Sequence, residues 1–262
     1  MENTIFNESC LDTMSRMGDC SIDLVVTSPP YDNLRAYDNE IDKIWSESVW
    51  KPIISELCRV IKEGGVIVWV VGDATIDGSE TGSSFKQALY FKECGLNLHD
   101  TMIWTKSGRI PTHERYYNIF EYMFVFSKGS PSTLNFIKDH KNISVGQKQR
   151  KDTIINKGKN QKKEGEYFTR GEYSRRGNVW YIPIGKTKGT ENHPATFPEN
   201  LANDHIISWS NEGDLVYDPF LGSGTTAKMA KLTHRKYVGS EINEDYFKIA
   251  QKRLSQTQEY LF

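Results

Sequence analysis

The tetrapeptide Ser28-Pro29-Pro30-Tyr31, which follows an apolar run, has the residue types to activate an amine. Proline fixes its backbone and lacks an N–H, so the turn presents carbonyl oxygens, with the Ser28 oxygen as a further acceptor. Two acceptors can hold both hydrogens of an NH₂ group. On a nucleobase, such a grip frees the nitrogen lone pair from the ring, and Tyr31 offers a flat face on which the base can stack.

A second stretch, "DPFLGSGTTAKMA", predicts a nucleoside-binding loop. Gly222, Gly224 and Ala227 fit the pattern G-x-G-x-x-A between an expected strand and helix, where glycines allow close approach of a ligand and the helix N-terminus offers free N–H groups. The next expected strand ends at Glu241, whose carboxylate can accept hydrogen bonds from both ribose hydroxyls. No Lys follows the glycines, which disfavours a phosphate-binding P-loop.

The elements that must position these loops alternate between strand and helix, which predicts an α/β fold with a mostly parallel sheet and helices on both faces. In such a sheet, the proline elbow and the glycine loop both follow strands and should face one pocket at the carboxyl edge. Strands are expected at 22–28, 64–73, 96–106, 118–129, 213–220 and 236–242, and helices at 46–64, 83–95, 222–234 and 243–258, with one more after Pro198.

Length and composition suit one globular domain. The chain has 262 residues, of which 37% are hydrophobic and 26% charged. Its apolar runs are too short to span a bilayer and its first residues do not resemble a leader, so we expect a cytoplasmic protein with no membrane contact. The four cysteines form no C-x-x-C pair, and we expect no metal site.

A basic stretch interrupts the alternation. Residues 138–190 contain 14 Lys and Arg against 5 Asp and Glu, whereas the rest of the chain contains 19 against 29. The stretch has almost no apolar periodicity and is either a functional insertion or a disordered segment. Its charge indicates a polyanionic partner, with a solvated surface loop as the alternative.

Together, "TSPPY" and the downstream "DPFLGSGTT" resemble the β-class DNA amino-methyltransferases that use S-adenosylmethionine, in which the catalytic motif precedes the cofactor motif. The resemblance covers nearly the whole chain. It implies a Rossmann-like methyltransferase fold with a catalytic half at 1–137, a target-recognition insertion at 138–190 and a cofactor-binding half at 191–262.

The resemblance also implies roles for individual residues. The catalytic motif is Ser28, Pro29, Pro30 and Tyr31. The motifs "DPFLGSGTT" and "YVGSEINEDYF", with "HPATFPENLANDHI", place the cofactor against Asp218, Phe220, Gly222, Gly224, Thr225, Thr226, Glu241, His193 and Phe197.

Asp73, at the end of "VVGD", is a further pocket residue or an ordinary turn residue. Where the family often has an Asp that contacts the cofactor adenine, this chain has Ser9, and Glu8 or Asp12 could take that role.

The resemblance implies methylation of a base that is flipped out of duplex DNA, with Lys106, Arg109 and Arg115 among the residues that hold the phosphates. Ser at the first position of the elbow favours cytosine N4, and adenine N6 is the alternative. An oxidoreductase that uses nicotinamide and a catalytically silent DNA-binding protein are the rivals from other classes, and the Pro-Pro-Tyr turn also occurs in methyltransferases of RNA and protein. Any restriction endonuclease partner is expected to be a separate chain, and the protein a monomer or a homodimer.

Overall fold

The structure, a computed structural model, describes residues 1–30, 45–110, 115–150, 154–156, 159–161, 167–184 and 198–257. The chain divides into two compact units. The first consists of Met1–Asn135 and Asn178–Phe262, and the second of Phe136–Gly177.

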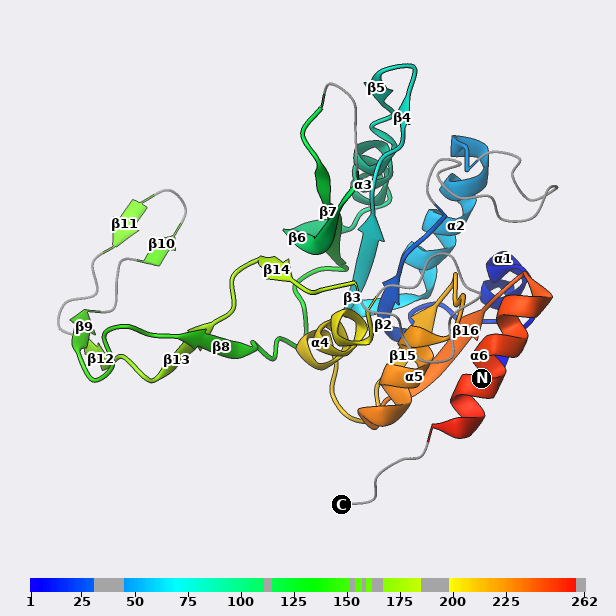
Figure 1. Cartoon of the computed structure of the whole chain (residues 1–262). Coiled ribbons are helices and arrows are strands. Elements are labelled where there is room, and N and C mark those ends of the chain that lie inside the picture. The colour runs from blue at the N-terminus through cyan, green and yellow to red at the C-terminus, as the bar shows by residue number, and fades with distance from the viewer. Residues whose placement is uncertain are drawn as a thin grey trace. The chain divides into compact units, whose positions relative to one another are not determined.

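An eight-stranded sheet forms the middle layer of the first unit (Figure 1). Among its described strands, β7 alone runs antiparallel to its two neighbours, β3 and β6, and the other adjacent strands are parallel. The strands lie in the order β1 (Thr4–Phe6), β16 (Lys236–Ser240), β15 (Leu215–Asp218), β2 (Ile22–Thr27), β3 (Ile61–Val71), β7 (Asn118–Ser127), β6 (Asn97–Ile110) and β14 (Val179–Tyr181).

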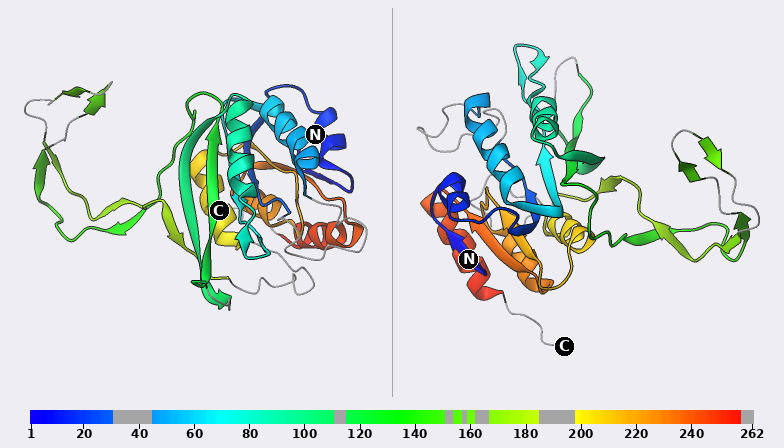
Figure 2. Two further views of the ribbon diagram at one scale, coloured as in Figure 1. Left: turned by 90° about the horizontal axis from the view of Figure 1, so that it is seen from above. Right: turned by 180° about the vertical axis from the view of Figure 1, so that it is seen from behind.

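Helices cover both faces of this sheet. On one face, side chains of α1 (Cys10–Ser15), α2 (Glu47–Val60) and α3 (Ser83–Glu93) share a core cluster with the strands. On the other, α4 (Glu199–Trp209) packs against β2 and α5 (Thr225–Leu232), which contacts β15, β16 and α6 (Glu244–Gln256). Figure 2 shows α3 and α4 on opposite sides of β6 and β7. The predicted fold class, a mostly parallel α/β sheet, is confirmed.

Continuous apolar sequence explains why β2 and β3 lie at the centre. Every residue from Val66 to Val71 is at most 1% exposed, because helices cover both faces. Trp69 fills the core on the α3 side, where its ring lies 5.2 Å from that of Phe91 and its Nε1 donates to Gln87 Oε1 over 2.8 Å. None of the described helices has the length and hydropathy needed to cross a membrane.

Several short elements were not predicted. They are β1, α1, β14 and the hairpin of β4 (Thr75–Ile76) with β5 (Ser79–Glu80). Each is too short to show a hydrophobic period, and β1 and β14 also depend on pairing with distant strands, β16 and β6. Our predicted insertion extended to residue 190, whereas β14 pairs with β6 in the main sheet.

The second unit is built from antiparallel strand pairs. Arg175 and Arg176 connect the first and last residues of this unit. The Arg175 guanidinium lies 3.8 Å from the centroid of the Phe136 ring, and Arg176 Nε donates to Asp139 over 2.8 Å. Sequence 136–177 contains 12 Lys and Arg against 5 Asp and Glu. The pairs are β8 (Lys138–Lys141) with β13 (Tyr173–Arg175), β9 (Lys148–Arg150) with β12 (Tyr167–Thr169), and β10 (Ile154–Asn156) with β11 (Lys159–Gln161).

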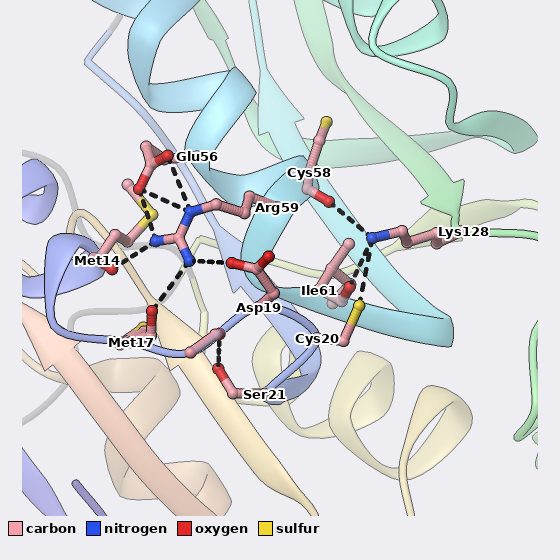
Figure 3. Close-up of polar contacts among 11 residues, drawn as sticks. Met14, Met17, Asp19, Cys20, Ser21, Glu56, Cys58, Arg59, Ile61 and Lys128 are labelled. Atoms are coloured by element: carbon pink, nitrogen blue, oxygen red, sulfur yellow. Dashed lines mark hydrogen bonds and ion pairs between the residues drawn. The ribbon is translucent and has the colours of Figure 1, made fainter.

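Arg59, at the end of α2, holds the turn that leads into β2 (Figure 3). Its Nη atoms donate to the carbonyl oxygens of Met14 and Met17 over 2.7 and 2.9 Å, and to the carboxylates of Glu56 and Asp19 over 2.7 Å each. These carboxylates raise the pKa of the guanidinium. The contacts fix the point at which the chain enters β2, and therefore the register of the strand that ends at the elbow.

We expect Arg59→Met to lower the free energy of unfolding by about 2 kcal/mol, because hydrogen bonds to a charged group are lost. Chemical denaturation measures the change. Lys248→Met is the control, since Lys248 forms an exposed ion pair with Glu244 on α6 and should change the stability by less than about 0.5 kcal/mol. Equal effects of the two substitutions would contradict the anchoring role of Arg59.

Candidate active site

The strand order places the two predicted loops at one point of the sheet. β15 and β2 are neighbours, but the chain continues from β15 to β16 on one side and from β2 to β3 on the other. Such a reversal opens a crevice outside the carboxyl ends of the two strands, where α/β proteins bind ligands. The elbow begins directly after β2 and the glycine loop directly after β15, so both border this crevice.

Side-chain hydrogen bonds tie the two strand ends together. Thr27 Oγ1 donates to Asp218 Oδ1 over 2.6 Å, and Thr226 Oγ1 on α5 donates to the carbonyl oxygen of Val26 over 3.1 Å. The three polar residues are each at most 1% exposed. These bonds hold the loops that follow β2 and β15 in a fixed relation, although Thr27 and Asp218 are 191 residues apart.

The described part of the elbow combines a half-buried Ser28 with a buried Pro29 and a half-buried Pro30. Proline lacks an N–H, so the backbone here offers acceptors without a competing donor at these two residues. Tyr31 lies outside the described residues, and its stacking role stays a prediction.

The glycine loop turns sharply into α5. Gly222 and Gly224 have φ angles of 53° and 81°, in the left-handed region that glycine adopts without strain. A Cβ on Gly224 would lie 3.0 Å from Ala250 Cβ of α6, so the glycine also permits close packing of the two helices. Thr225 and Thr226 are buried at the first turn of α5.

Glu241 reaches the glycine loop from the end of β16, as its sequence position indicated. Its Oε2 accepts from the Gly222 N–H over 2.7 Å and its Oε1 from the Asn243 N–H over 2.8 Å. Burial raises the pKa of this carboxyl, and the two N–H groups oppose the rise. Each oxygen retains a lone pair, so the carboxylate can accept further hydrogen bonds from a ligand.

Asp218 is a buried carboxyl at the end of β15, with 1% exposure. Burial raises its pKa to about 6, and the hydrogen bonds from Thr27 and from the Phe220 N–H limit the rise. Both donors contact Oδ1. The group therefore changes charge within the range of neutral to mildly acidic pH.

Arg253 stabilises the glycine loop through hydrogen bonds to Ser223, a role that we did not predict from the sequence. This α6 residue is 6% exposed, and its Nη1 donates to the carbonyl oxygen and the hydroxyl of Ser223 over 2.6 and 2.8 Å. Its Nη2 pairs with Glu199 of α4 over 2.7 Å, and Lys228 of α5 contacts the same carboxylate oxygen. The only signal was one Arg on the inner face of an amphipathic helix, and its partners are distant in sequence.

Other predicted residues have contacts that limit their roles. The Asp73 carboxylate accepts from the backbone N–H and hydroxyl of Ser84, over 2.9 and 2.6 Å, and from Ser83 and Thr81, so it caps α3. Ser9 is the N-cap of α1. Glu8 pairs with Arg16, whose hydrogen bond lowers the pKa of the Glu8 carboxyl.

The Phe220 ring lies at the border between loop and core. It makes edge contacts with Trp45 and Trp69, at centroid distances of 5.4 and 6.1 Å. His193 and Phe197 lie outside the described residues, so their cofactor contacts stay predictions.

Comparisons with known proteins assign the family. The chain matches the N6/N4 methyltransferase family, described as DNA methylase, over residues 22–252, and it belongs to that family. The orphan methyltransferase M.BamHII of Bacillus amyloliquefaciens is 54% identical over 250 residues, which cover 91% of this chain and 90% of that protein.

Solved structures share the fold. The PvuII DNA methyltransferase, specific for cytosine N4, superimposes with a TM-score of 0.72 at 18% identity and covers 100% of this chain and 88% of its own. The putative DNA modification methylase TTHA0409 of Thermus thermophilus, in a complex with S-adenosyl-L-methionine, gives a TM-score of 0.64 at 21% identity, with 97% and 94% covered. Membership of this family excludes the alternative interpretation of the glycine loop as the cofactor site of a nicotinamide-dependent oxidoreductase.

Asp218→Asn should change the pH dependence of stability. The unfolded carboxyl has a pKa near 3.9 and the folded one a higher pKa, so the wild type loses stability as the pH rises, whereas the amide does not titrate. Between pH 4.5 and 7.5, we expect the wild type to lose about 2 kcal/mol relative to the variant.

Denaturation of the cofactor-free protein across this range measures the difference. Asp77→Asn, which removes an exposed carboxylate from the turn between β4 and β5, controls for the loss of one negative charge. Parallel pH profiles of the wild type and Asp218→Asn would show that burial does not raise the Asp218 pKa.

Proposed function

We propose that this DNA methylase transfers a methyl group from S-adenosylmethionine to the exocyclic N4 amine of cytosine in duplex DNA. The observation that carries the proposal is the juxtaposition of Ser28–Pro30 with the glycine loop at the point where the strand order reverses. An amine-gripping elbow and a nucleoside-binding loop thereby face one crevice.

The residues of the glycine loop fit the proposed cofactor. Gly222 and Gly224 let the backbone approach a ligand closely, and the buried Glu241 carboxylate has acceptor capacity for ribose hydroxyls. Thr225 and Thr226 begin α5, whose N-terminus borders the crevice, and Phe220 and Asp218 lie at its base. When bound, S-adenosylmethionine supplies a sulfonium methyl group, which the base nitrogen takes up with loss of a proton.

The elbow prepares the amine for this reaction. Ser28 and the carbonyl oxygen of Pro29 hold the two amine hydrogens, which moves the nitrogen toward a tetrahedral geometry, and Tyr31 stacks on the ring. No side-chain nucleophile is required, since the leaving sulfonium becomes neutral. Catalysis is therefore mainly a matter of positioning.

Cytosine is the base that we favour. Ser28 at the first position of the elbow supports N4 methylation, and the structurally similar PvuII enzyme is specific for cytosine N4. Adenine N6 is the alternative, because its amine requires the same two acceptors and the family includes both activities.

The second unit is our candidate for target recognition. Its strand pairs carry an excess of Lys and Arg, which suits the phosphate backbone of duplex DNA. Methylation of a base in a duplex requires base flipping into the crevice. A separate restriction endonuclease, and a monomeric or homodimeric state, remain predictions.

We expect Ser28→Ala to lower turnover on the order of 100-fold, because one of the two acceptors that hold the amine is lost. Cofactor affinity, measured by calorimetry, should be unchanged, and Tyr31→Ala should behave in the same way. Ser255→Ala, on the exposed side of α6, is the control and should retain full activity. Full activity of Ser28→Ala would refute the role of the elbow.

Product analysis tests the base. The protein is incubated with labelled S-adenosylmethionine and unmethylated bacterial DNA, and the DNA is digested to nucleosides and analysed by mass. We expect the label on N4-methyldeoxycytidine. Label on N6-methyldeoxyadenosine would support the proposed site but contradict the assignment of cytosine as the target base. No label despite cofactor binding would favour the catalytically silent protein or an RNA or protein acceptor.

A further inference from the structure

A largely buried ion pair lies at the carboxyl edge of the sheet, away from the cofactor half. Lys106 Nζ contacts Glu121 Oε1, and the two side chains are only 13% and 6% exposed. The ammonium also lies 5.2 Å from the centroid of the Trp104 ring. We predicted Lys106 among the phosphate-binding residues, but its burial is unlike that of a surface cation. Burial of two charges is costly, so a buried pair needs an explanation.

The strand register places this pair beside the end of β3. Val71 of β3 pairs with Tyr122 of β7, so the next residue, Gly72, comes opposite Glu121. A Cβ on Gly72 would lie 3.6 Å from Glu121 Cγ, which confirms the proximity. Glu121 pairs in turn with Trp104 of β6, and Lys106 follows two residues nearer the carboxyl end of that strand.

The pair is on the same face of the sheet as Ser28. Side chains alternate along a strand, and Phe124 of β7 belongs to the core on the α2 side. Met123, the preceding residue, points to the opposite face, where its Sδ lies 3.2 Å from Nε2 of His205 on α4. Glu121 is two residues from Met123 and therefore shares the α4 face. On β2, Val25 belongs to the α2-side core, so Val26 and then Ser28 follow on the α4 side.

Gly72 leaves room between the elbow and the ion pair. Thr27 pairs with Trp69, so Ser28 lies next to the last residues of β3, and β3 separates β2 from β7. Two strand spacings amount to about 10 Å across the sheet, and the two-residue offset along the strands makes the separation about 12 Å. A pyrimidine with one hydrogen bond at each end spans about the same distance. Gly72, which lies opposite Glu121 and two residues beyond the level of Ser28, has no side chain on this part of β3.

We propose that Lys106 binds the Watson–Crick edge of the flipped base, with Glu121 as the residue that positions it. This inference rests on the proposed function. When Ser28 and Pro29 hold the amine of cytosine, ring N3 and carbonyl O2 on the adjoining edge need donors, and an ammonium group has three donors and no acceptor. On its Watson–Crick edge, adenine has a single acceptor, N1, and no carbonyl group. Lys106 therefore favours cytosine over adenine.

Equilibrium binding to two duplexes tests the contact. Both contain the recognition site mapped from methylated DNA, one with the target base and one with an abasic target position, and a non-reactive cofactor analogue is present. Lys106→Met removes the charge but keeps a long apolar stem against Trp104. We expect a tenfold to hundredfold loss of affinity for the duplex with the base, in the range of a charged hydrogen bond, and no loss for the abasic duplex.

Lys62→Met is the matched control, because Lys62 pairs with Asp23 at the opposite end of β2 and β3. Equal loss on both duplexes would assign Lys106 to the DNA backbone or to structure, and no loss on either would remove it from binding, so either result overturns the proposal. Thermal unfolding and cofactor affinity of the variant exclude a general loss of folding as the cause.

A double-mutant cycle tests the role of Glu121. Glu121→Gln should lose affinity for the duplex with the base, and should add no further loss in the Lys106→Met background, because it acts through Lys106. Additive losses would contradict this role. If product analysis shows methyladenine, the cytosine assignment fails, and the comparison with an abasic duplex is repeated at adenine and decides separately whether Lys106 contacts the base.

Discussion

The site depends on one buried hydrogen bond, from the Thr27 hydroxyl to the Asp218 carboxylate. It joins the ends of two adjacent parallel strands, although the two residues are 191 positions apart in the sequence. Because Asp218 is buried, its oxygen needs this donor, and separation of the strand ends would leave a polar group unsatisfied. The elbow starts at the next residue after Thr27, and the glycine loop follows Asp218. Together with the Thr226–Val26 bond, this contact aligns the elbow and the glycine loop, the two halves of the proposed site.

Charged groups around the crevice are buried but paired, which favours rigidity. Glu241 is held by two backbone N–H groups, and Arg253 donates to the loop from beneath while Glu199 balances its charge. A buried polar network in which some groups lack hydrogen-bond partners destabilises the fold, whereas one in which every group has a partner holds a single geometry. In a reaction that depends on positioning, a fixed loop avoids reorganisation when the ligands bind.

Local sequence patterns predicted the elements whose signal is local. The apolar runs of β2 and β3, the glycine loop and the acid at the end of β16 could all be recognised, because each depends on a few consecutive residues. The antiparallel direction of β7 could not, since the apolar pattern of a strand is the same whichever way the strand runs. The roles of Arg253 and of the Lys106–Glu121 pair could not be predicted either, because they depend on contacts with residues that only the folded chain brings together.

The distribution of charge separates attraction to DNA from chemistry on the base. Outside residues 138–190 the chain has more acidic than basic residues, so its general surface does not favour a polyanion. The basic strand pairs of the second unit supply the long-range attraction that we propose for target recognition, and this attraction is independent of sequence. The elbow, in contrast, offers uncharged acceptors, which suit the amine that we propose it binds and do not attract phosphate. In our proposal, Lys106 combines the two requirements: its pairing with Glu121 shields the positive charge from the DNA backbone and leaves its other hydrogen-bond donors for a base that enters the crevice.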